Sequence, residues 1–373
     1  MHNPERGFNP NEMKERREQA RDFVVSADSM ASSSHPQRND DKVLGRPDNR
    51  YNRPENPGLR SNVEYRIGKE QELAPKLEEL NVYGLFDGIS LARGDVASRT
   101  ASSIMTETMT NLEPGATAEE SLQAISEGLR KAHEACKTAS AGSTADIVRL
   151  LPGEGDMPTT VVFGHVGDSR IYKRNQEGRL ERITIDQNRY NQEIEIQQLM
   201  GNITPEQASA YRLTNNFDDL DDAPNEIKIA FMEQHVLTSS LGGNYEPKTG
   251  QFDLQEGESI VIVSDGVHDN MTDQEIAEEL DLPGDNPAER LNIRAMEKAR
   301  RLHEHYHRKQ ELEQEKKELD ELTAQGSLGK AVDLNRFRKL KEMIDSKTPA
   351  DLKDIKGYDD MTSVIIESPP QTN

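Results

Sequence analysis

Two aspartates each stand at the end of an apolar, β-rich run and directly before a glycine. Asp87 closes NVYGLFDG, and Asp265 closes ESIVIVSDG. Strand ends are rigid, so two such strands could hold several carboxylates close together. Carboxylate oxygens select hard cations such as Mg²⁺ or Mn²⁺, and a pair of these ions could activate water and orient a phosphoryl group. The glycine allows close approach of the backbone, whose carbonyl can then serve as a ligand.

Further acids lie beside predicted strands and turns. NDDKVLG places Asp40 before a short apolar run, and LERITIDQN places Asp186 after one. YDDMTSVII places Asp359 and Asp360 just before the last predicted strand. GHVGDSRIY puts Asp168 in a tight turn, where we expect it to bond backbone amides. Because a single Asp-Gly pair ends many ordinary turns, the metal site is predicted from the set of acids together.

The bulk properties of the chain exclude several classes of protein. The formal net charge of −22 argues against nucleic acid as a partner, because phosphates would be repelled. The single cysteine, Cys136, cannot form an intrachain disulfide, which favours a cytoplasmic location. The N-terminal segment has no apolar core typical of a signal peptide, and no stretch approaches the length of a membrane-spanning helix. We therefore expect a cytoplasmic protein with no membrane segment.

The elements that would position these acids follow from the periodicity. Apolar residues recur at helical spacing over residues 94–112 and 117–138, and Thr117 with Glu120 forms a capping-box pattern. Residues 188–236 are polar and predicted to be mostly irregular, with some helix around 203–213. Helices are also predicted over 271–280 and 287–302, and β-branched runs predict strands over 81–86, 143–151, 159–167, 169–174, 180–186, 258–264 and 361–368.

A charged block interrupts the predicted domain near its end. Residues 302–346 have a thin apolar seam at helical spacing, which predicts a helical hairpin. This hairpin is either a solvated insertion or a surface for a protein partner or for self-association. Its alternating histidines, His303, His305 and His307, would scatter over different faces of a helix, so no metal site is predicted there. The predicted organisation is a polar N-terminal extension at 1–24, a main domain at 25–301 plus 356–368, a charged helical insertion at 302–355, and a tail at 369–373.

The order of the motifs resembles the metal-dependent type-2C protein phosphatase family, which dephosphorylates serine and threonine. VGDSRIY and VSDGVHD carry the resemblance most specifically. It covers residues 25–300 and 357–367 and implies an α+β fold, an antiparallel β-sandwich flanked by helices on both sides, with a binuclear metal centre at one end. The matching segments, in the family's order, are NDD (39–41), FDG (86–88), GSTA (142–145), VGDSRIY (166–172), ITIDQN (183–188), LTSSLGG (237–243), VSDGVHD (263–269) and DDMT (359–362).

The resemblance also assigns metal ligands. Asp87 would bridge two metal ions, and the Gly88 carbonyl would bind one of them. Asp265 and Asp359 would hold the ion of the first site. Asp40 stands in the position of the acid that serves the other ion, where the family usually has Glu. The implied cofactors are two Mn²⁺ or Mg²⁺ ions per chain.

Other implied roles are less direct. Asp186 would match the acid that, together with Asp265, can hold a weak third ion in bacterial-type members. The family's phosphate-binding arginine would fall at Pro36, so Arg38, two residues further on, is the candidate for that role. Ile89 stands where some members have a histidine proposed as general acid. Arg38, Asp87 and Asp265 are thus the predicted catalytic residues.

The implied reaction is the hydrolysis of phosphoserine and phosphothreonine in a phosphoprotein, by in-line attack of a metal-bridging hydroxide. One alternative is a haloacid-dehalogenase-type enzyme, but such sites need Asp-x-Asp, and Ile89 and Val267 occupy the second positions. The other alternative is a pseudophosphatase that acts as a binding or regulatory module through the helical insertion. The presence of Asp87, Asp265 and Asp359 argues against it, and a titration with divalent ions would separate the two.

Overall fold

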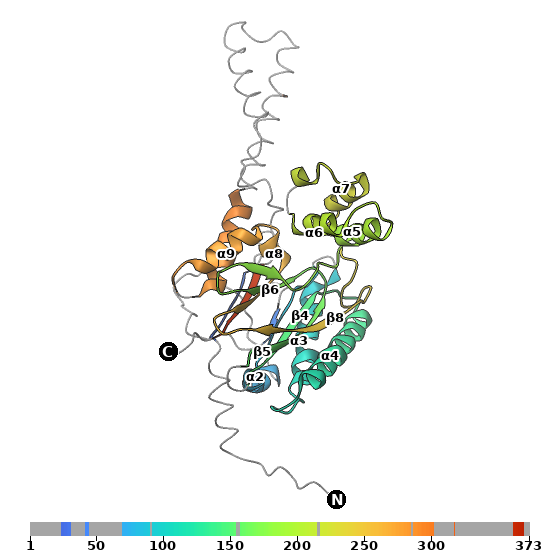
Figure 1. The fold of residues 1–373 in the computed structure, drawn as a ribbon. Helices are drawn as coiled ribbons and strands as arrows, with labels where there is room; N and C mark the ends of the chain where they lie inside the picture. The colour runs from blue at the N-terminus through green and yellow to red at the C-terminus, as the bar shows by residue number, and fades with distance from the viewer. Residues whose placement is uncertain are drawn as a thin grey trace, which may run out of the picture.

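Two five-stranded antiparallel sheets form the centre of the molecule (Figure 1). The computed structural model describes residues 24–30, 42–44, 69–89, 92–153, 157–214, 217–284, 286–301, 317 and 361–368. The two sheets, with helices packed on the outer face of each, confirm the predicted antiparallel sandwich. The predicted insertion at 302–355, apart from Lys317, lies outside the described residues, as do its three histidines. Its role as a partner surface or self-association arm stays a prediction.

The first sheet brings the last strand of the chain to its centre. Strand β10 lies between β1 and β9, and every pair of neighbours is antiparallel. The order in this sheet is β1 (Val24–Met30), β10 (Met361–Glu367), β9 (Ser259–Val263), β6 (Arg170–Arg174) and β7 (Leu180–Arg182). The predicted strand 180–186 is thus shorter than expected, because the chain leaves the sheet after Arg182.

The second sheet contains the first of the two Asp-Gly strands. Strand β3 pairs with β2 and β4, and β5 joins β4 to the edge strand β8. The order is β2 (Lys42–Leu44), β3 (Val82–Phe86), β4 (Ala145–Leu151), β5 (Thr159–Val166) and β8 (Lys248–Leu254). Strand β8 was not predicted from the sequence, because its residues are mostly polar and mostly exposed.

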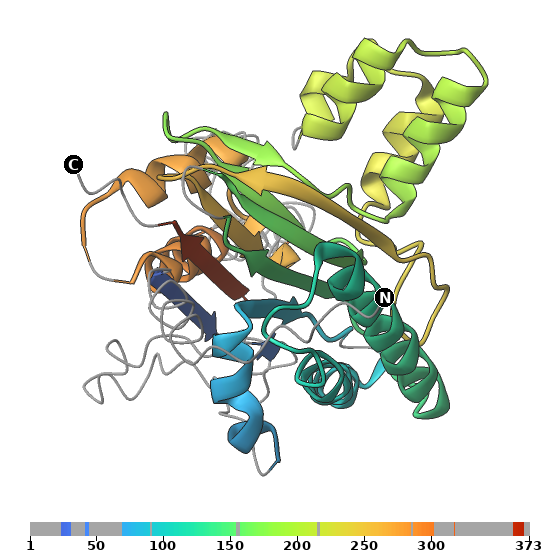
Figure 2. The same cartoon turned by 60° about the horizontal axis from the view of Figure 1, so that its bottom comes forward.

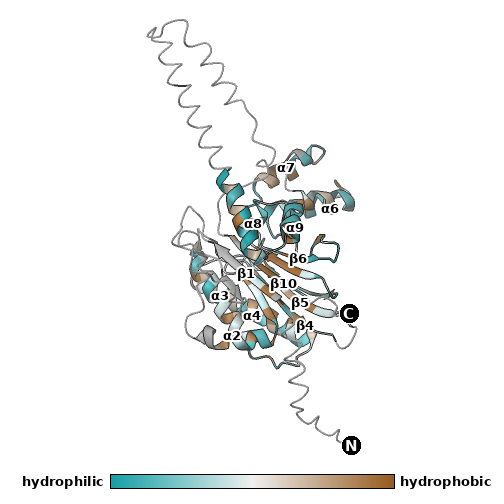
Figure 3. Cartoon of the chain, turned by 90° about the vertical axis from the view of Figure 1, so that its left-hand side faces the viewer, coloured by the Kyte–Doolittle hydropathy of each residue, from teal (hydrophilic) through white to brown (hydrophobic). Residues whose placement is uncertain are grey.

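The apolar strands are continuous runs because both of their faces are buried. In β9, Ile260 and Ile262 pack between the two sheets, whereas Val261 and Val263 pack against helices on the outer side. This alternation follows from the two-residue period of a strand. A run that is apolar at every position is therefore what a strand covered on both faces requires. Figure 3 shows the hydrophobic residues along the strands between the helices.

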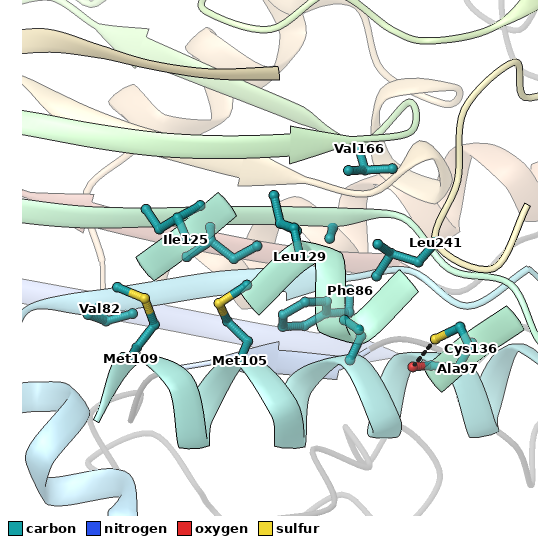
Figure 4. Packing of buried hydrophobic residues seen from close by; sticks show 14 of the residues in the cluster. Val82, Phe86, Ala97, Met105, Met109, Ile125, Leu129, Cys136, Val166 and Leu241 are labelled. Atoms are coloured by element: carbon teal, nitrogen blue, oxygen red, sulfur yellow. Dashed lines mark hydrogen bonds between the residues drawn. The ribbon is translucent and has the colours of Figure 1, made fainter. Parts of the chain in front are cut away.

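Helices cover the outer face of each sheet (Figure 2). Helix α3 (Gly94–Met109) and helix α4 (Ala118–Thr138) pack on the second sheet, with α2 (Lys69–Glu79) beside them. The capping box predicted at Thr117 and Glu120 is confirmed at the start of α4. Figure 4 shows side chains of α3 and α4 against those of the sheet, with the Cys136 thiol donating to the Ala97 carbonyl over 3.6 Å.

The outer face of the first sheet is covered by three helical segments from the C-terminal half. They are α8 (Asp265–His268), α9 (Asp273–Asp281) and a helix over residues 287–301. Their buried residues include Ile276, Leu291 and Ala295, which pack against β9 and β10. None of the helices in the described ranges is long and apolar enough to cross a membrane.

A separate helical subdomain projects from one end of the sandwich (Figure 1). The prediction that residues 188–236 are mostly irregular is wrong, because these helices form a small core of their own around Tyr190, Ile194 and Phe231. Asn188 caps the first helix, and a Thr204–Gln207 capping box starts the second. The elements are α5 (Arg189–Leu199), α6 (Pro205–Leu213), η3 (Phe217–Leu220) and α7 (Asn225–Met232).

Candidate active site

The first Asp-Gly sequence directly follows β3, and its backbone is fixed by the two residues that precede β4. The Thr144 amide donates to the Asp87 carbonyl over 2.7 Å, and the Asp87 amide donates to the Thr144 hydroxyl over 3.1 Å. The Ser143 hydroxyl also donates to the Asp87 carbonyl over 2.8 Å. Asp87 is 9% exposed. The backbone that carries this carboxylate is therefore held rigidly from a neighbouring strand.

The same threonine links the two sheets. The Thr144 hydroxyl lies 2.9 Å from the hydroxyl of Ser169, which immediately precedes β6. Arg170, the first residue of β6, pairs across the first sheet with Val263, the last residue of β9. Asp265 follows Val263 by two residues. The structure therefore places Asp87 and Asp265 at the same end of the sandwich, one on each sheet.

The last strand begins at this end as well. The Ser264 amide donates to the Thr362 carbonyl, and the Thr362 amide donates to the Ser264 hydroxyl, each over 3.0 Å. The strand that follows Asp359 and Asp360 in the sequence thus begins beside Asp265. Asp359 itself lies outside the described residues, as do Asp40 and Arg38. Within the described ranges there is accordingly no group of three or more acids, histidines and cysteines that could hold a metal ion.

The loop after Asp87 is compact because a glycine packs on it. A Cβ atom at Gly94, where α3 begins, would lie 2.4 Å from the Gly88 carbonyl oxygen and 2.3 Å from its carbon. The Ile89 amide donates to the Gly142 carbonyl over 2.9 Å, which ties the loop to the chain before β4. Gly94 was not predicted as a site residue. Its only signal was a glycine at the start of a helical pattern, a few residues after Asp87 and Gly88.

A buried arginine binds one of the two remaining acids, Asp186. Arg170 donates to both carboxylate oxygens of Asp186, from Nε over 2.9 Å and from a terminal nitrogen over 2.7 Å. Burial would raise the pKa of Asp186, but the guanidinium outweighs it and holds the pKa below its usual range. Asp168 lies in the predicted turn, and its carboxyl group is buried near other acids. Burial, together with the charges of Asp186 and Asp269, raises the pKa of Asp168 to about 8.

This arginine also connects the site end to the helical subdomain. Its guanidinium donates to the Tyr172 hydroxyl over 3.3 Å, and that hydroxyl donates to Asp273 over 2.9 Å. Arg182 in turn donates to Asp273 and, over 2.9 Å, to the Arg212 carbonyl at the end of α6. The position of the subdomain is thus linked to the buried acids through charged hydrogen bonds.

The donors at this end suit hard cations. Asp87, Gly88 and Asp265 would supply only oxygen atoms, which Mg²⁺ and Mn²⁺ prefer. The one cysteine, Cys136, is fully buried in the packing of α4 on the second sheet. Its sulfur is hydrogen bonded to the α3 backbone, so it is not a donor for this site.

Comparison with protein families identifies the class. The sequence profile described as "Protein phosphatase 2C" matches residues 85–314. The chain belongs to the protein phosphatase 2C family and is a metal-dependent serine/threonine protein phosphatase by class. Its family was thus recognised correctly from the order of the motifs. Comparison with curated proteins gives no match.

Solved structures of bacterial proteins resemble this chain at low sequence identity. The serine/threonine phosphatase PstP/Ppp of Mycobacterium tuberculosis is 18% identical, with 93% of this chain and 99% of that chain covered and a TM-score of 0.48. PppA of Pseudomonas aeruginosa is 15% identical, with 92% and 97% covered and a TM-score of 0.47. MsPP of Mycobacterium smegmatis is 18% identical, with 92% and 97% covered and a TM-score of 0.47.

Proposed function

We propose that this chain hydrolyses phosphoserine and phosphothreonine in proteins at a centre of two Mn²⁺ or Mg²⁺ ions. The ligands would be Asp87, the Gly88 carbonyl and Asp265, together with Asp40 and Asp359. The observation that supports this most directly is the Thr144–Ser169 hydrogen bond between the sheets. Through it, the two Asp-Gly sequences share one end of the sandwich.

The protein's own residues would contribute rigidity. When bound, the ions would lower the pKa of water and neutralise charge on the phosphoryl group. The three hydrogen bonds to the Asp87 backbone fix the position from which its carboxylate projects. The close packing of Gly94 fixes the loop that carries the Gly88 carbonyl. Such preorganisation means that little reorganisation is needed during the reaction.

A third ion at Asp186 would bind weakly. The Asp186 carboxylate already accepts two hydrogen bonds from Arg170, so a cation there would share its oxygens with a guanidinium. Each carboxylate oxygen has a second lone-pair site, so sharing is chemically feasible. The positive charge of Arg170 nevertheless opposes a second cation. We therefore propose that Asp186 and Asp265 hold any third ion only at high metal concentration.

Arg38 is proposed to bind the substrate phosphate, in place of the family's arginine two residues earlier. Arg38→Ala should raise the Michaelis constant for a phosphopeptide, because a charged hydrogen bond to the phosphate is lost. Binding of Mn²⁺, measured by calorimetry, should be unchanged. An unchanged Michaelis constant would show that another residue holds the phosphate.

The test is hydrolysis of p-nitrophenyl phosphate and of a phosphothreonine peptide, each with EDTA, Mg²⁺ or Mn²⁺. Asp87→Asn and Asp265→Asn should abolish metal-dependent turnover while the far-ultraviolet circular dichroism stays unchanged. Asp253→Asn is the matched control, because Asp253 is exposed on β8 and pairs with Thr160, at the end of β5 away from Asp87. Turnover in Asp265→Asn equal to that of the control would refute the proposed site.

The pseudophosphatase alternative gives a different pattern in the same assay. A folded wild-type protein with no turnover under any metal would favour it over the enzyme. Calorimetry with Mn²⁺ would then show whether the acids still bind a cation. No observation on the described residues favours this alternative.

A further inference from the structure

A buried acid–imidazole pair lies between strands β4 and β5 of the second sheet. Asp146 of β4 is directly opposite His165 of β5, and the His165 Nδ1 lies 2.8 Å from an oxygen of Asp146. Their side chains are 0% and 1% exposed. The adjacent rungs of the ladder pair Ala145 with Val166, and Ile147 with Gly164. One charged rung thus stands between apolar ones, close to the end of the sheet that carries Asp87.

The other nitrogen of this imidazole reaches out of the sheet. His165 Nε2 lies 3.2 Å from the Ile185 carbonyl oxygen. The Ile185 carbonyl can only accept a hydrogen bond, so Nε2 carries a proton and donates to it, and the second proton of the pair lies between Nδ1 and Asp146. Burial lowers the pKa of His165, but the Asp146 carboxylate, Asp186 and the Ile185 carbonyl together raise it above its usual value.

The segment that this imidazole ring holds has no apolar anchor at Ile185. The Ile185 side chain is 57% exposed, so it contributes little packing. The next two residues are also held by polar contacts, Asp186 by Arg170 and Gln187 by Gly167. The Gln187 amide donates to the Gly167 carbonyl, and the Gly167 amide donates to the Gln187 side chain, both over 2.8 Å.

We infer that Asp146 and His165 are a positioning pair for the phosphatase reaction, an inference that rests on the proposed function. Asp146 orients the imidazole ring, whose Nε2–H fixes the Ile185 carbonyl and thereby the backbone that carries Asp186, the carboxylate of which is bound by Arg170. If the pair had a purely structural role, its replacement by apolar residues would change turnover only through stability. Replacing a buried ion pair in this way is often neutral or stabilising. The positioning role predicts that such a replacement lowers turnover even where the protein remains stable.

Two amide substitutions separate the two nitrogens of the ring. In His165→Gln the side-chain amide can reach the position of Nε2 and donate to Ile185, whereas in His165→Asn it reaches only toward Asp146. With p-nitrophenyl phosphate and saturating Mn²⁺, His165→Asn should lower kcat by roughly 10- to 100-fold with the Michaelis constant nearly unchanged. His165→Gln should retain kcat within about 3-fold, because it replaces the same hydrogen bond.

Hydrogen exchange supplies a readout independent of activity. The Gln187 amide should exchange faster in His165→Asn than in the wild type, and at the wild-type rate in His165→Gln. A double variant, Asp146→Leu with His165→Leu, should remain folded and show the same loss of kcat as His165→Asn. This double variant still tests the proposal if one of the amide variants fails to fold.

The outcomes are distinguishable from failure of the proposed function. Wild-type turnover that is lost in Asp265→Asn establishes the reaction, and the positioning pair is then judged on its own variants. Equal kcat in folded His165→Asn and His165→Gln, or unchanged kcat in the double variant, would overturn the inference. If the wild type has no turnover, unchanged exchange of the Gln187 amide in His165→Asn would overturn it instead.

Discussion

Removing the guanidinium of Arg170 should destabilise the protein more than any loss of a surface ion pair. Arg170→Met leaves an aliphatic chain in place but removes both hydrogen bonds to Asp186, which is 6% exposed. Breaking a buried pair by removing one partner costs about 3–5 kcal/mol, because the other charge stays buried without compensation. We therefore expect the free energy of unfolding at pH 7 to fall by that amount.

The measurement is urea unfolding at pH 7 in EDTA, which removes any contribution from metal binding to the native state. Arg130→Met is the matched control. Arg130 donates to both oxygens of Glu127 over 2.9 and 2.8 Å, with the side chains 56% and 44% exposed. Its substitution should leave the unfolding midpoint unchanged within error, because exposed pairs are screened by water.

Two further comparisons test whether the uncompensated charge of Asp186 causes the loss of stability in Arg170→Met. Arg170→Met with Asp186→Leu should be more stable than Arg170→Met alone, because no uncompensated carboxylate remains. In the wild type the pKa of Asp186 is depressed, so its stabilising contribution is present above its unfolded-state pKa and is lost as the pH falls through the folded value. The deficit of the single variant should therefore shrink as the pH is lowered. A deficit at pH 7 no larger than that of Arg130→Met would refute the argument from burial.

Three other substitutions test separate parts of the structure. Thr272→Ala removes the cap of α9 and should cost about 1 kcal/mol in urea unfolding; no change would show that the cap is dispensable. Gly94→Ala introduces a Cβ atom against the Gly88 carbonyl, so it should cost about 1–3 kcal/mol and weaken Mn²⁺ binding in calorimetry; wild-type affinity would contradict the packing. The pKa of Asp168 is raised from 3.8 to about 8, so without metal its burial destabilises the fold increasingly as the pH rises between those values. In EDTA, Asp168→Asn should flatten this fall in stability, and an unaltered pH profile would contradict the assignment.

The sequence was most informative where a local residue pattern directly reflects the burial or the capping of an element in the folded protein. The runs before Asp87 and Asp265 were recognisable as strands because strands buried on both faces are continuously apolar. The cap of α4 was recognisable because its donor and acceptor lie three residues apart. The edge strand β8 and the helices α5 and α6 gave weaker signals, since their exposed polar residues obscure the period.

The partners of the buried charges could not be predicted in the same way. Asp186 was predicted as a ligand of a weak third ion, and the sequence gave no sign that Arg170 holds both of its oxygens. Asp146 and His165 are separated by the turn between β4 and β5, and only the register of the ladder brings them together. Such pairs depend on the alignment of strands, which residue spacing does not specify.

By itself, the amino-acid sequence indicated the strands and the acids at their ends through local periodicity, and the family through the order of motifs. The antiparallel sandwich followed only from that family resemblance. The tertiary structure decided that Asp87 and Asp265 share one end of the sandwich, through the Thr144–Ser169 hydrogen bond between the sheets. It also decided that the Arg170 guanidinium neutralises Asp186, whereas burial raises the pKa of Asp168. The physical reason is that burial and electrostatic interaction depend on distances in space, and residues far apart in the chain set those distances only once the sheets have packed.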